Sequence, residues 1–122
     1  MPFASLIGAE LVSATSEEVR GRMEWAPERC TTGGVLHGGA LMALADSTGA
    51  YCAVLNLPAG AGTATIESKT NFFRAVREGY VEAVSTPLHV GRTTIVVQTD
   101  LLDNQGRRVA RVTQTQAVLP AT

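Results

Sequence analysis

The chain has few of the features that mark a metal centre, a membrane span or a nucleic-acid surface. Only two cysteines occur among 122 residues, Cys30 and Cys52, and they show neither metal-ligand spacing nor a disulfide framework. The longest apolar stretch, near residues 40–55, is interrupted by residues 46–49, so it is no membrane span of about 20 apolar residues. The net charge of −1 lacks the basic excess of a general nucleic-acid binder.

The first ten residues, MPFASLIGAE, also lack the basic segment and the long apolar segment of a secretory signal. Together with free thiols, this predicts a cytoplasmic protein that binds neither membrane nor nucleic acid. The length leaves room for one hydrophobic core, and a hydrophobic content of 45% is ordinary for a globular protein. We therefore expect a single domain over residues 1–122.

The pattern of apolar residues predicts strands on both sides of one helix. A short helical turn is expected at residues 2–7, two extended segments within residues 9–26, and a loop over residues 27–35. Residues 38–55 are rich in Ala and Leu and apolar nearly all round, which predicts one buried helix. Four strands follow, at residues 63–73, 80–88 (ending near Pro87), 93–102 and 108–119, with a hairpin turn at residues 103–106.

This order of elements predicts an α+β fold in which an antiparallel sheet wraps around one long central helix. Such an arrangement covers the helix on one side and gives the sheet a buried face. A chain this short leaves a sheet edge and part of the helix uncovered, so we expect an oligomer.

The most informative segment is residues 33–49, GGVLHGGALMALADSTG. Gly38 and Gly39 open the helix, where a ligand can approach the backbone closely and unsatisfied N–H groups suit an oxyanion. Asp46 lies in the middle of the same apolar helix, where burying an unpaired charge is costly. Chemistry is one reason to keep such a residue.

Each feature also has a purely structural interpretation. The glycine pair can form a tight corner between loop and helix. Asp46 can be a solvated carboxylate at an interface, or can bind Ser47 or Thr48, and His37 can be a hydrogen-bonded structural residue. The combination of HGG with an acid eight residues after Gly38 is more specific than any one of these elements.

The distance between Gly38 and Asp46 has a consequence for the assembly. Eight residues of α-helix rise about 12 Å, whereas a catalytic carboxylate and an oxyanion donor must both lie within about 3 Å of one reacting group. Gly38 and Asp46 of one chain therefore cannot serve the same carbonyl. If both are catalytic, Asp46 meets Gly38 of a second subunit, and two antiparallel helices across a two-fold axis form two equal sites.

The sequence resembles the hotdog-fold thioesterases, in particular the phenylacetate-pathway type and the 4-hydroxybenzoyl-CoA thioesterases with a carboxylate on the central helix. The resemblance covers roughly residues 10–119 and lies in residues 36–39 (LHGG), 44–46 (LAD), 70–79 (TNFFRAVREG) and a C-terminal meander with Asp103, Gly106 and Arg107. It implies a hotdog fold, acyl-CoA substrates, and a dimer of continuous sheets usually paired into a tetramer.

The resemblance also implies catalytic roles. The Gly38 N–H is the oxyanion donor, and Asp46 is either the nucleophile or the general base that activates water. His37 belongs to the same block. Relatives carry a catalytic Asn or Gln six positions before that histidine. This chain has the shorter Thr31 there, whose hydroxyl can still hydrogen-bond water or the thioester, so Thr31 is the fourth predicted catalytic residue. Ala50 stands where some relatives have a polar helper.

For coenzyme A, the resemblance points to Arg74 and to the turn that holds Arg92 and Thr93, since arginine suits phosphate. Gly39 and Phe72 complete the predicted substrate-binding set. Arg77, Arg107 and Arg108 are secondary phosphate candidates that can instead be solvated surface charges. Met42 and Tyr51 can line an acyl pocket or belong to the core.

The sequence thus predicts hydrolysis of an aryl-CoA, arylacetyl-CoA or other small acyl-CoA. Water in excess makes the reaction downhill, so we expect neither a metal nor a redox cofactor. The alternative is a non-catalytic acyl-CoA sensor of the same fold. A hotdog dehydratase fits less well, because its catalytic His–Asp pair lies on the helix whereas His37 precedes it.

Overall fold

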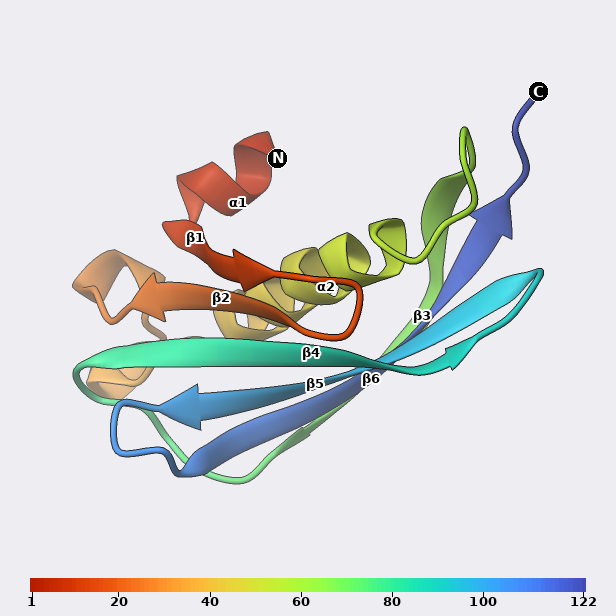
Figure 1. Ribbon diagram of the computed structural model, residues 1–122. Coiled ribbons are helices and arrows are strands. Elements are labelled where there is room, and N and C mark those ends of the chain that lie inside the picture. Colours follow the sequence, from red (N-terminus) through yellow and green to blue (C-terminus); the bar gives the residue numbers. More distant parts are fainter.

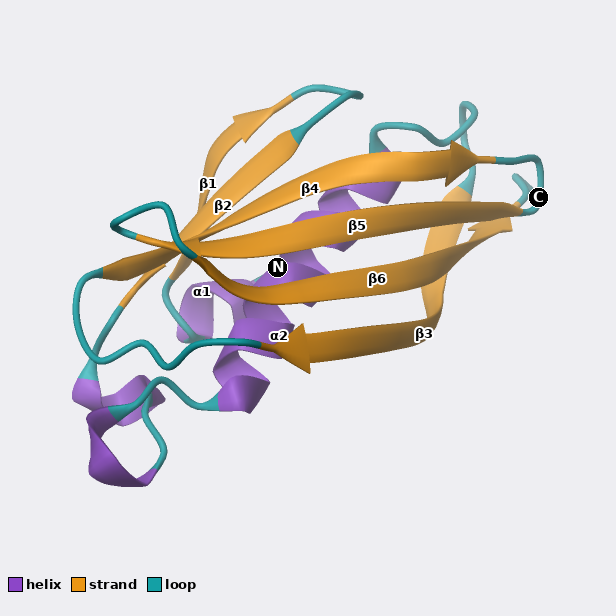
Figure 2. Cartoon of the chain, turned by 90° about the horizontal axis from the view of Figure 1, so that it is seen from below, coloured by secondary structure: helices purple, strands orange, loops and turns teal.

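The computed structural model describes residues 1–122 as one antiparallel sheet with a long helix across one face (Figure 1). The sheet order is β1 (Ala9–Ala14), β2 (Val19–Glu24), β4 (Tyr80–Val90), β5 (Thr94–Asp103), β6 (Arg108–Leu119) and β3 (Gly62–Phe72). Helix α2 (Gly38–Val54) contacts every strand, and the short α1 (Pro2–Leu6) packs near β1. Seen from below, the strands lie in front of α2 (Figure 2). The face of the sheet that points away from α2 carries no helix. The expected α+β fold is confirmed.

Two details of the expected elements need correction. Strand β4 does not end near Pro87 but continues to Val90, and its pairing with β5 shifts register between Pro87 and His89. A proline has no N–H to donate and is tolerated where a bulge interrupts the ladder. The expected loop over residues 27–35 contains two 3-10 turns, Pro27–Arg29 and Thr32–Gly34.

The hydrophobic core is divided in two along α2. One cluster surrounds the first half of the helix at Leu44, and a smaller one surrounds Cys52 in the second half. Along α2, β5 and β6, buried polar residues lie between the two clusters: Thr48, Thr99 and Gln114. Ser85 of β4 is also buried, and its hydroxyl lies 2.6 Å from that of Thr99. The core is therefore polar around Thr48, in the turn of α2 that directly follows Asp46.

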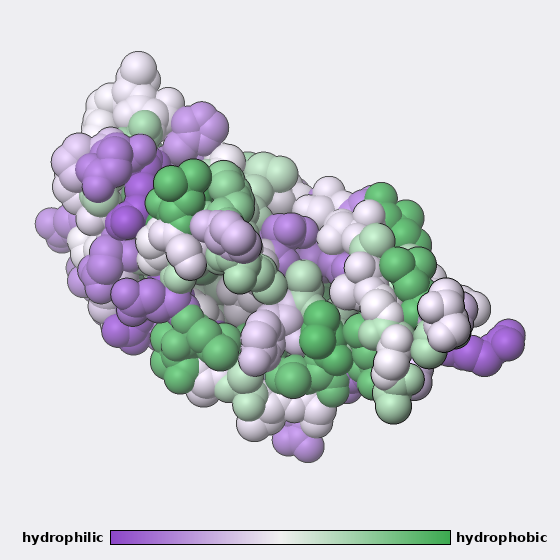
Figure 3. Space-filling view, turned by 90° about the horizontal axis from the view of Figure 1, so that it is seen from above, coloured by the Kyte–Doolittle hydropathy of each residue, from purple (hydrophilic) through white to green (hydrophobic).

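Strand β3 forms an edge of the sheet and has no buried residue. Helix α2 and the residue after it also leave apolar side chains in solvent, namely Met42, Val54 and Leu55. The space-filling view from above shows several apolar patches on this face of the molecule (Figure 3). The expected open edge and half-covered helix are confirmed, while the oligomer stays a prediction. No helix has the length and apolar character that crossing a membrane requires.

The turn between β5 and β6 is held by the carboxylate of Asp103. Its Oδ1 accepts from the backbone N–H groups of Gln105 at 3.0 Å and Arg107 at 2.9 Å, and its Oδ2 accepts from Arg107 Nε at 2.8 Å. Burial raises the pKa of Asp103, but the hydrogen bonds from Arg107 and Gln105 outweigh it and the pKa is lowered overall.

This lowered pKa predicts a pH-dependent contribution to stability. The fold favours the ionised carboxylate, so the contribution is present above the ordinary value of 3.8 and is lost as pH falls through the lowered value. We expect Asp103→Asn to lower the melting temperature at neutral pH, with a difference from wild type that narrows as pH falls toward about 3. Thermal unfolding followed by circular dichroism across this range measures it, and a constant difference would contradict the assignment.

Candidate active site

The start of α2 leaves one backbone donor free. His37 is the N-cap, and its Nδ1 accepts a hydrogen bond from the Gly39 N–H at 2.8 Å. The N–H groups of Ala40 and Leu41 donate to the carbonyl of His37. The Gly38 N–H has no acceptor within the chain, so it is the donor at this helix end that can bind an oxyanion. The observed contact makes His37 a helix cap, and its catalytic role stays a prediction.

Phe72, a residue of the predicted substrate-binding set, lies against the helix start. A Cβ built on Gly38 would lie 3.2 Å from Phe72 Cζ, so the glycine allows a close approach of ring and backbone. The Phe72 side chain is still half exposed, at 49%. The end of β3 and the start of α2 therefore form one local surface.

Asp46 is exposed in the single chain, so its carboxylate is solvated there, one of the two interpretations that the sequence leaves open. Its Oδ1 accepts from Thr65 Oγ1 at 3.4 Å and from Gln114 Nε2 at 3.5 Å. Neither neighbour on the helix binds it, and the Thr48 hydroxyl instead donates to the carbonyl of Leu44 at 2.8 Å. The carboxylate thus avoids the cost of burial by facing the edge strand.

Gly38 and Asp46 lie on the same side of α2. Gly38 contacts Phe72 at the end of β3, and Asp46 contacts Thr65 nearer its beginning. The helix starts at Gly38, so the two residues are separated by about 12 Å along its axis. Both therefore face the uncovered edge of the sheet, too far apart to act on one carbonyl within a single chain.

The loop before α2 carries Thr31, whose exposed side chain makes no hydrogen bond within the chain. Two side chains hold this loop: Trp25 Nε1 donates to the carbonyl of Gly34 at 3.0 Å, and Arg77 Nη1 donates to that of Gly33 at 3.3 Å. The sequence assigns Trp25 no role beyond packing, so this anchor is visible only in the structure.

The arginines divide into paired and unpaired groups. Arg107 pairs with Asp103 at 2.8 Å, and Arg108 lies 3.3 Å from Asp100. Arg74 and Arg92 are exposed and have no carboxylate partner. Among the predicted phosphate ligands, Arg74 and Arg92 are thus free of ion pairs within the chain.

These two arginines lie at opposite ends of the sheet. The Arg74 N–H donates to the carbonyl of Val109, whereas the carbonyl of Thr93, next to Arg92, accepts from the N–H of Val118. Nine residues of β6 separate these contacts, or about 30 Å at the usual rise of a strand. One chain therefore does not bring Arg74 together with Arg92 and Thr93.

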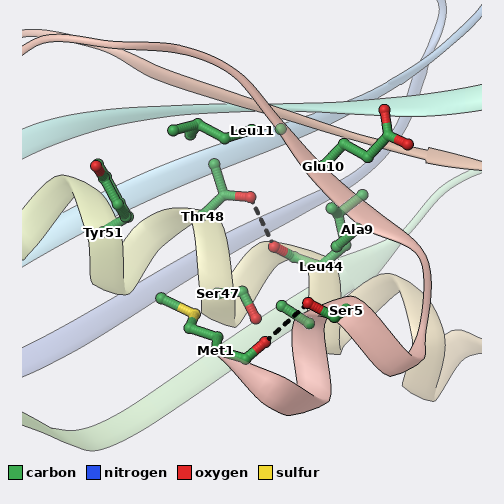
Figure 4. A pocket seen from close by; sticks show the side chains of 11 residues that line it. Met1, Ser5, Ala9, Glu10, Leu11, Leu44, Ser47, Thr48 and Tyr51 are labelled. Atoms are coloured by element: carbon green, nitrogen blue, oxygen red, sulfur yellow. Dashed lines mark hydrogen bonds between the residues drawn. The ribbon is translucent and has the colours of Figure 1, made fainter.

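Two cavities lie beside α2. The cavity in Figure 4, about 210 Å³, is formed by α1, β1 and the middle of α2, and its lining includes Ser47, Thr48 and Tyr51. A second, of about 470 Å³, lies at the start of α2 beside His37 and Gly39. Asp46 lines neither cavity. In a single chain, the Asp46 carboxylate is therefore exposed to solvent on the side away from Thr65.

The two cysteines take no part in this arrangement. Cys52 is fully buried, and burial raises the pKa of its thiol to about 11, so it stays protonated. Cys30 borders the second cavity, and its Sγ donates to the carbonyl of Ala26 at 3.3 Å.

Sequence reasoning misses the two residues that contact Asp46, Thr65 and Gln114. The sequence indicates Gln114 only as one of the alternating residues of the last strand, and Thr65 only as part of a β-branched run. One sequence feature could have indicated Gln114: the alternation of apolar and polar residues in the last strand places this glutamine on the face that points toward the core.

Comparison with known proteins gives a consistent result. Residues 33–110 match the model of the thioesterase superfamily. The chain is 36% identical over 86 residues to 1,4-dihydroxy-2-naphthoyl-CoA hydrolase of Escherichia coli K12, a match over 70% of this chain and 63% of that protein. It thus spans less than two thirds of that hydrolase.

Solved structures with similar folds agree with this match. Thioesterase HI1161 of Haemophilus influenzae has a TM-score of 0.92 at 28% identity, covering 96% of this chain and 82% of that one. A variant of the phenylacetic acid degradation protein PaaI of Thermus thermophilus has a TM-score of 0.89 at 26% identity, covering 98% of this chain and 100% of that one.

Proposed function

Because the chain belongs to the thioesterase superfamily and has its hotdog fold, we propose that it hydrolyses an acyl-CoA thioester to a free acid and coenzyme A. The proposed acyl group is aryl, arylacetyl or another small acyl. The names of two relatives support it, since one is a naphthoyl-CoA hydrolase and the other a phenylacetic acid degradation protein. The observation that carries the proposal is a free Gly38 N–H and the Asp46 carboxylate on the same open side of one helix.

The site is completed by a second copy of the chain. The edge strand β3 has unpaired backbone groups and no buried residue, so it can pair antiparallel with the partner's β3 about a two-fold axis. Two α2 helices then run antiparallel side by side. Asp46 of one chain faces the partner's Gly38, and the dimer has two equal sites, with tetramers formed from such dimers.

The reaction needs only these groups and water. In one route, Asp46 attacks the thioester carbon, coenzyme A leaves as thiolate and takes a proton, and water hydrolyses the resulting mixed anhydride. In the other, Asp46 removes a proton from the water that attacks the carbon directly; the C–S bond then breaks, and coenzyme A leaves as thiolate and takes up that proton. In both, the Gly38 N–H donates to the oxygen that becomes negative, which stabilises the transition state.

Coenzyme A binding would use the two uncommitted arginines. Antiparallel pairing of β3 brings the start of the partner's strand to the end of this one. The turn with Arg92 and Thr93 lies at the end of the sheet where β3 starts, and Arg74 follows the end of β3. The partner's Arg92 would thus approach Arg74, and two guanidinium groups suit the phosphates of coenzyme A.

A panel of benzoyl, phenylacetyl and straight-chain acyl-CoA thioesters tests the proposal. With a thiol reagent that reports free coenzyme A, we expect catalytic release, fastest with an aryl or arylacetyl substrate. Tight binding of these thioesters without release would favour the non-catalytic sensor. Neither release nor binding with any member of the panel would contradict both functions.

A further inference from the structure

Gln114 is a polar side chain placed where the fold favours an apolar one. It lies on the face of β6 that packs under α2, and it has no exposed surface. Its position falls between the two halves of the hydrophobic core. Burying an amide is unfavourable unless its hydrogen bonds are replaced, so the residue calls for a reason beyond packing.

The amide of Gln114 is used only toward Asp46. Its Nε2 lies 3.5 Å from Asp46 Oδ1, and its Oε1 is buried with no hydrogen-bond partner. The contact is at the long limit for a hydrogen bond, as is common for reactive groups without substrate. The fold thus buries an incompletely satisfied glutamine beside the carboxylate of the proposed site.

Gly49 provides the space for this amide. A Cβ at position 49 would overlap Gln114 Oε1 and lie 2.7 Å from its Cδ. Glycine in the interior of a helix is less stable than alanine, and Gly49 is buried inside α2. The helix thus carries a poor helix former where it admits the glutamine side chain.

A second chain of hydrogen bonds reaches the same carboxylate oxygen. Gln116 Nε2 donates to Thr65 Oγ1 at 2.7 Å, which leaves the threonine hydrogen free to point at Asp46 Oδ1, 3.4 Å away. Gln116 is also almost fully buried, and Thr63 Oγ1 lies 3.0 Å from its Oε1. Both donors that reach Asp46 thus converge on Oδ1, and neither binds Oδ2.

We propose that Gln114 is a positioning residue for the reaction: with Thr65 it holds Oδ1 of Asp46, so that Oδ2 faces the thioester or the attacking water. This inference rests on the proposed function, because it assigns Asp46 as the reacting carboxylate. Gln114 itself does not touch the substrate. It acts through the orientation of Asp46, where a displacement of about 1 Å can cost about a hundredfold in rate.

Gln114→Met separates this role from a structural one. Methionine has a similar length and no polar atom, so it fills the site and removes the unpartnered oxygen. We expect kcat to fall at least about tenfold with KM unchanged, while the melting temperature stays the same or rises. A normal kcat in the folded variant would overturn the inference.

Gly49→Ala displaces the Gln114 amide without altering it and removes a helix-breaking glycine, so it gives the same expected loss of kcat should the first variant fold poorly. Thr113→Val is the matched control, since Thr113 precedes Gln114, lies on the other face of β6 and makes no side-chain hydrogen bond. Its kinetics should equal those of wild type.

A double variant shows whether Gln114 acts through Asp46. In an Asp46→Asn background, Gln114→Met should cause no further loss of kcat, because a positioning residue has nothing left to orient. A further loss in that background would overturn the inference. Failure of the proposed function is a different result: Asp46→Asn would then itself be fully active.

Discussion

Asp46→Asn is expected to lower kcat by about 10²–10⁴-fold while the protein remains folded. Asparagine keeps the shape of the side chain and an oxygen that can accept from Thr65. It can neither attack a thioester carbon nor take a proton from water at neutral pH. Because Asp46 is exposed in the chain and asparagine has a similar helix propensity, we expect little change in the melting temperature.

Release of coenzyme A under steady-state conditions measures this effect, with circular dichroism to verify the fold. Glu17→Gln is the matched control, because Glu17 is an exposed acid whose side chain makes no ion pair. It should retain full activity. Full turnover by Asp46→Asn would remove the carboxylate from the mechanism, whichever of the two routes is considered.

The fold and the helix that carries the site could be predicted from local features. The glycine pair after His37 marks the beginning of α2, and the alternation of Ile95, Val97, Thr99 and Leu101 gives the buried face of β5, as found. The predicted end of β4 at Pro87 was wrong, because a proline usually ends a strand unless a bulge removes the need for its N–H.

The environment of Asp46 could not be predicted in this way. Its exposure follows from the uncovered side of α2, and its partners Thr65 and Gln114 lie 19 and 68 residues away in sequence. Which side chains of β3 and β6 reach the helix depends on strand register, which a single sequence does not specify. The distance between Arg74 and Arg92 depends in the same way on the path of β6.

Gly38→Pro tests the oxyanion donor with little effect on the fold. Gly38 is the first residue of α2, where proline is favoured, and His37 before it has an extended backbone with ψ 134°, which proline also favours. The lost N–H has no acceptor in the chain. We expect kcat to fall by about 10²–10³-fold, the usual cost of one oxyanion donor.

Gly38→Ala is the control for this substitution. Its Cβ also crowds Phe72, at 3.2 Å from Cζ, but the N–H is kept, so the loss of kcat should be much smaller. Comparable losses in both variants would assign the effect to the displaced phenylalanine ring, and equal melting temperatures would show that the fold is unaffected. The difference in kcat between the two variants therefore measures the contribution of the N–H at position 38.

Mixing the two inactive chains decides whether each site is shared between subunits. In a heterodimer of Asp46→Asn and Gly38→Pro, one site combines the intact Gly38 of the first chain with the intact Asp46 of the second. Random exchange of subunits, after mild denaturant and dilution, should restore about one quarter of wild-type activity. Since about 12 Å separates the two residues along α2, a site built from a single chain leaves the mixture inactive. That result would contradict the pairing of β3 proposed above, even if both residues proved essential.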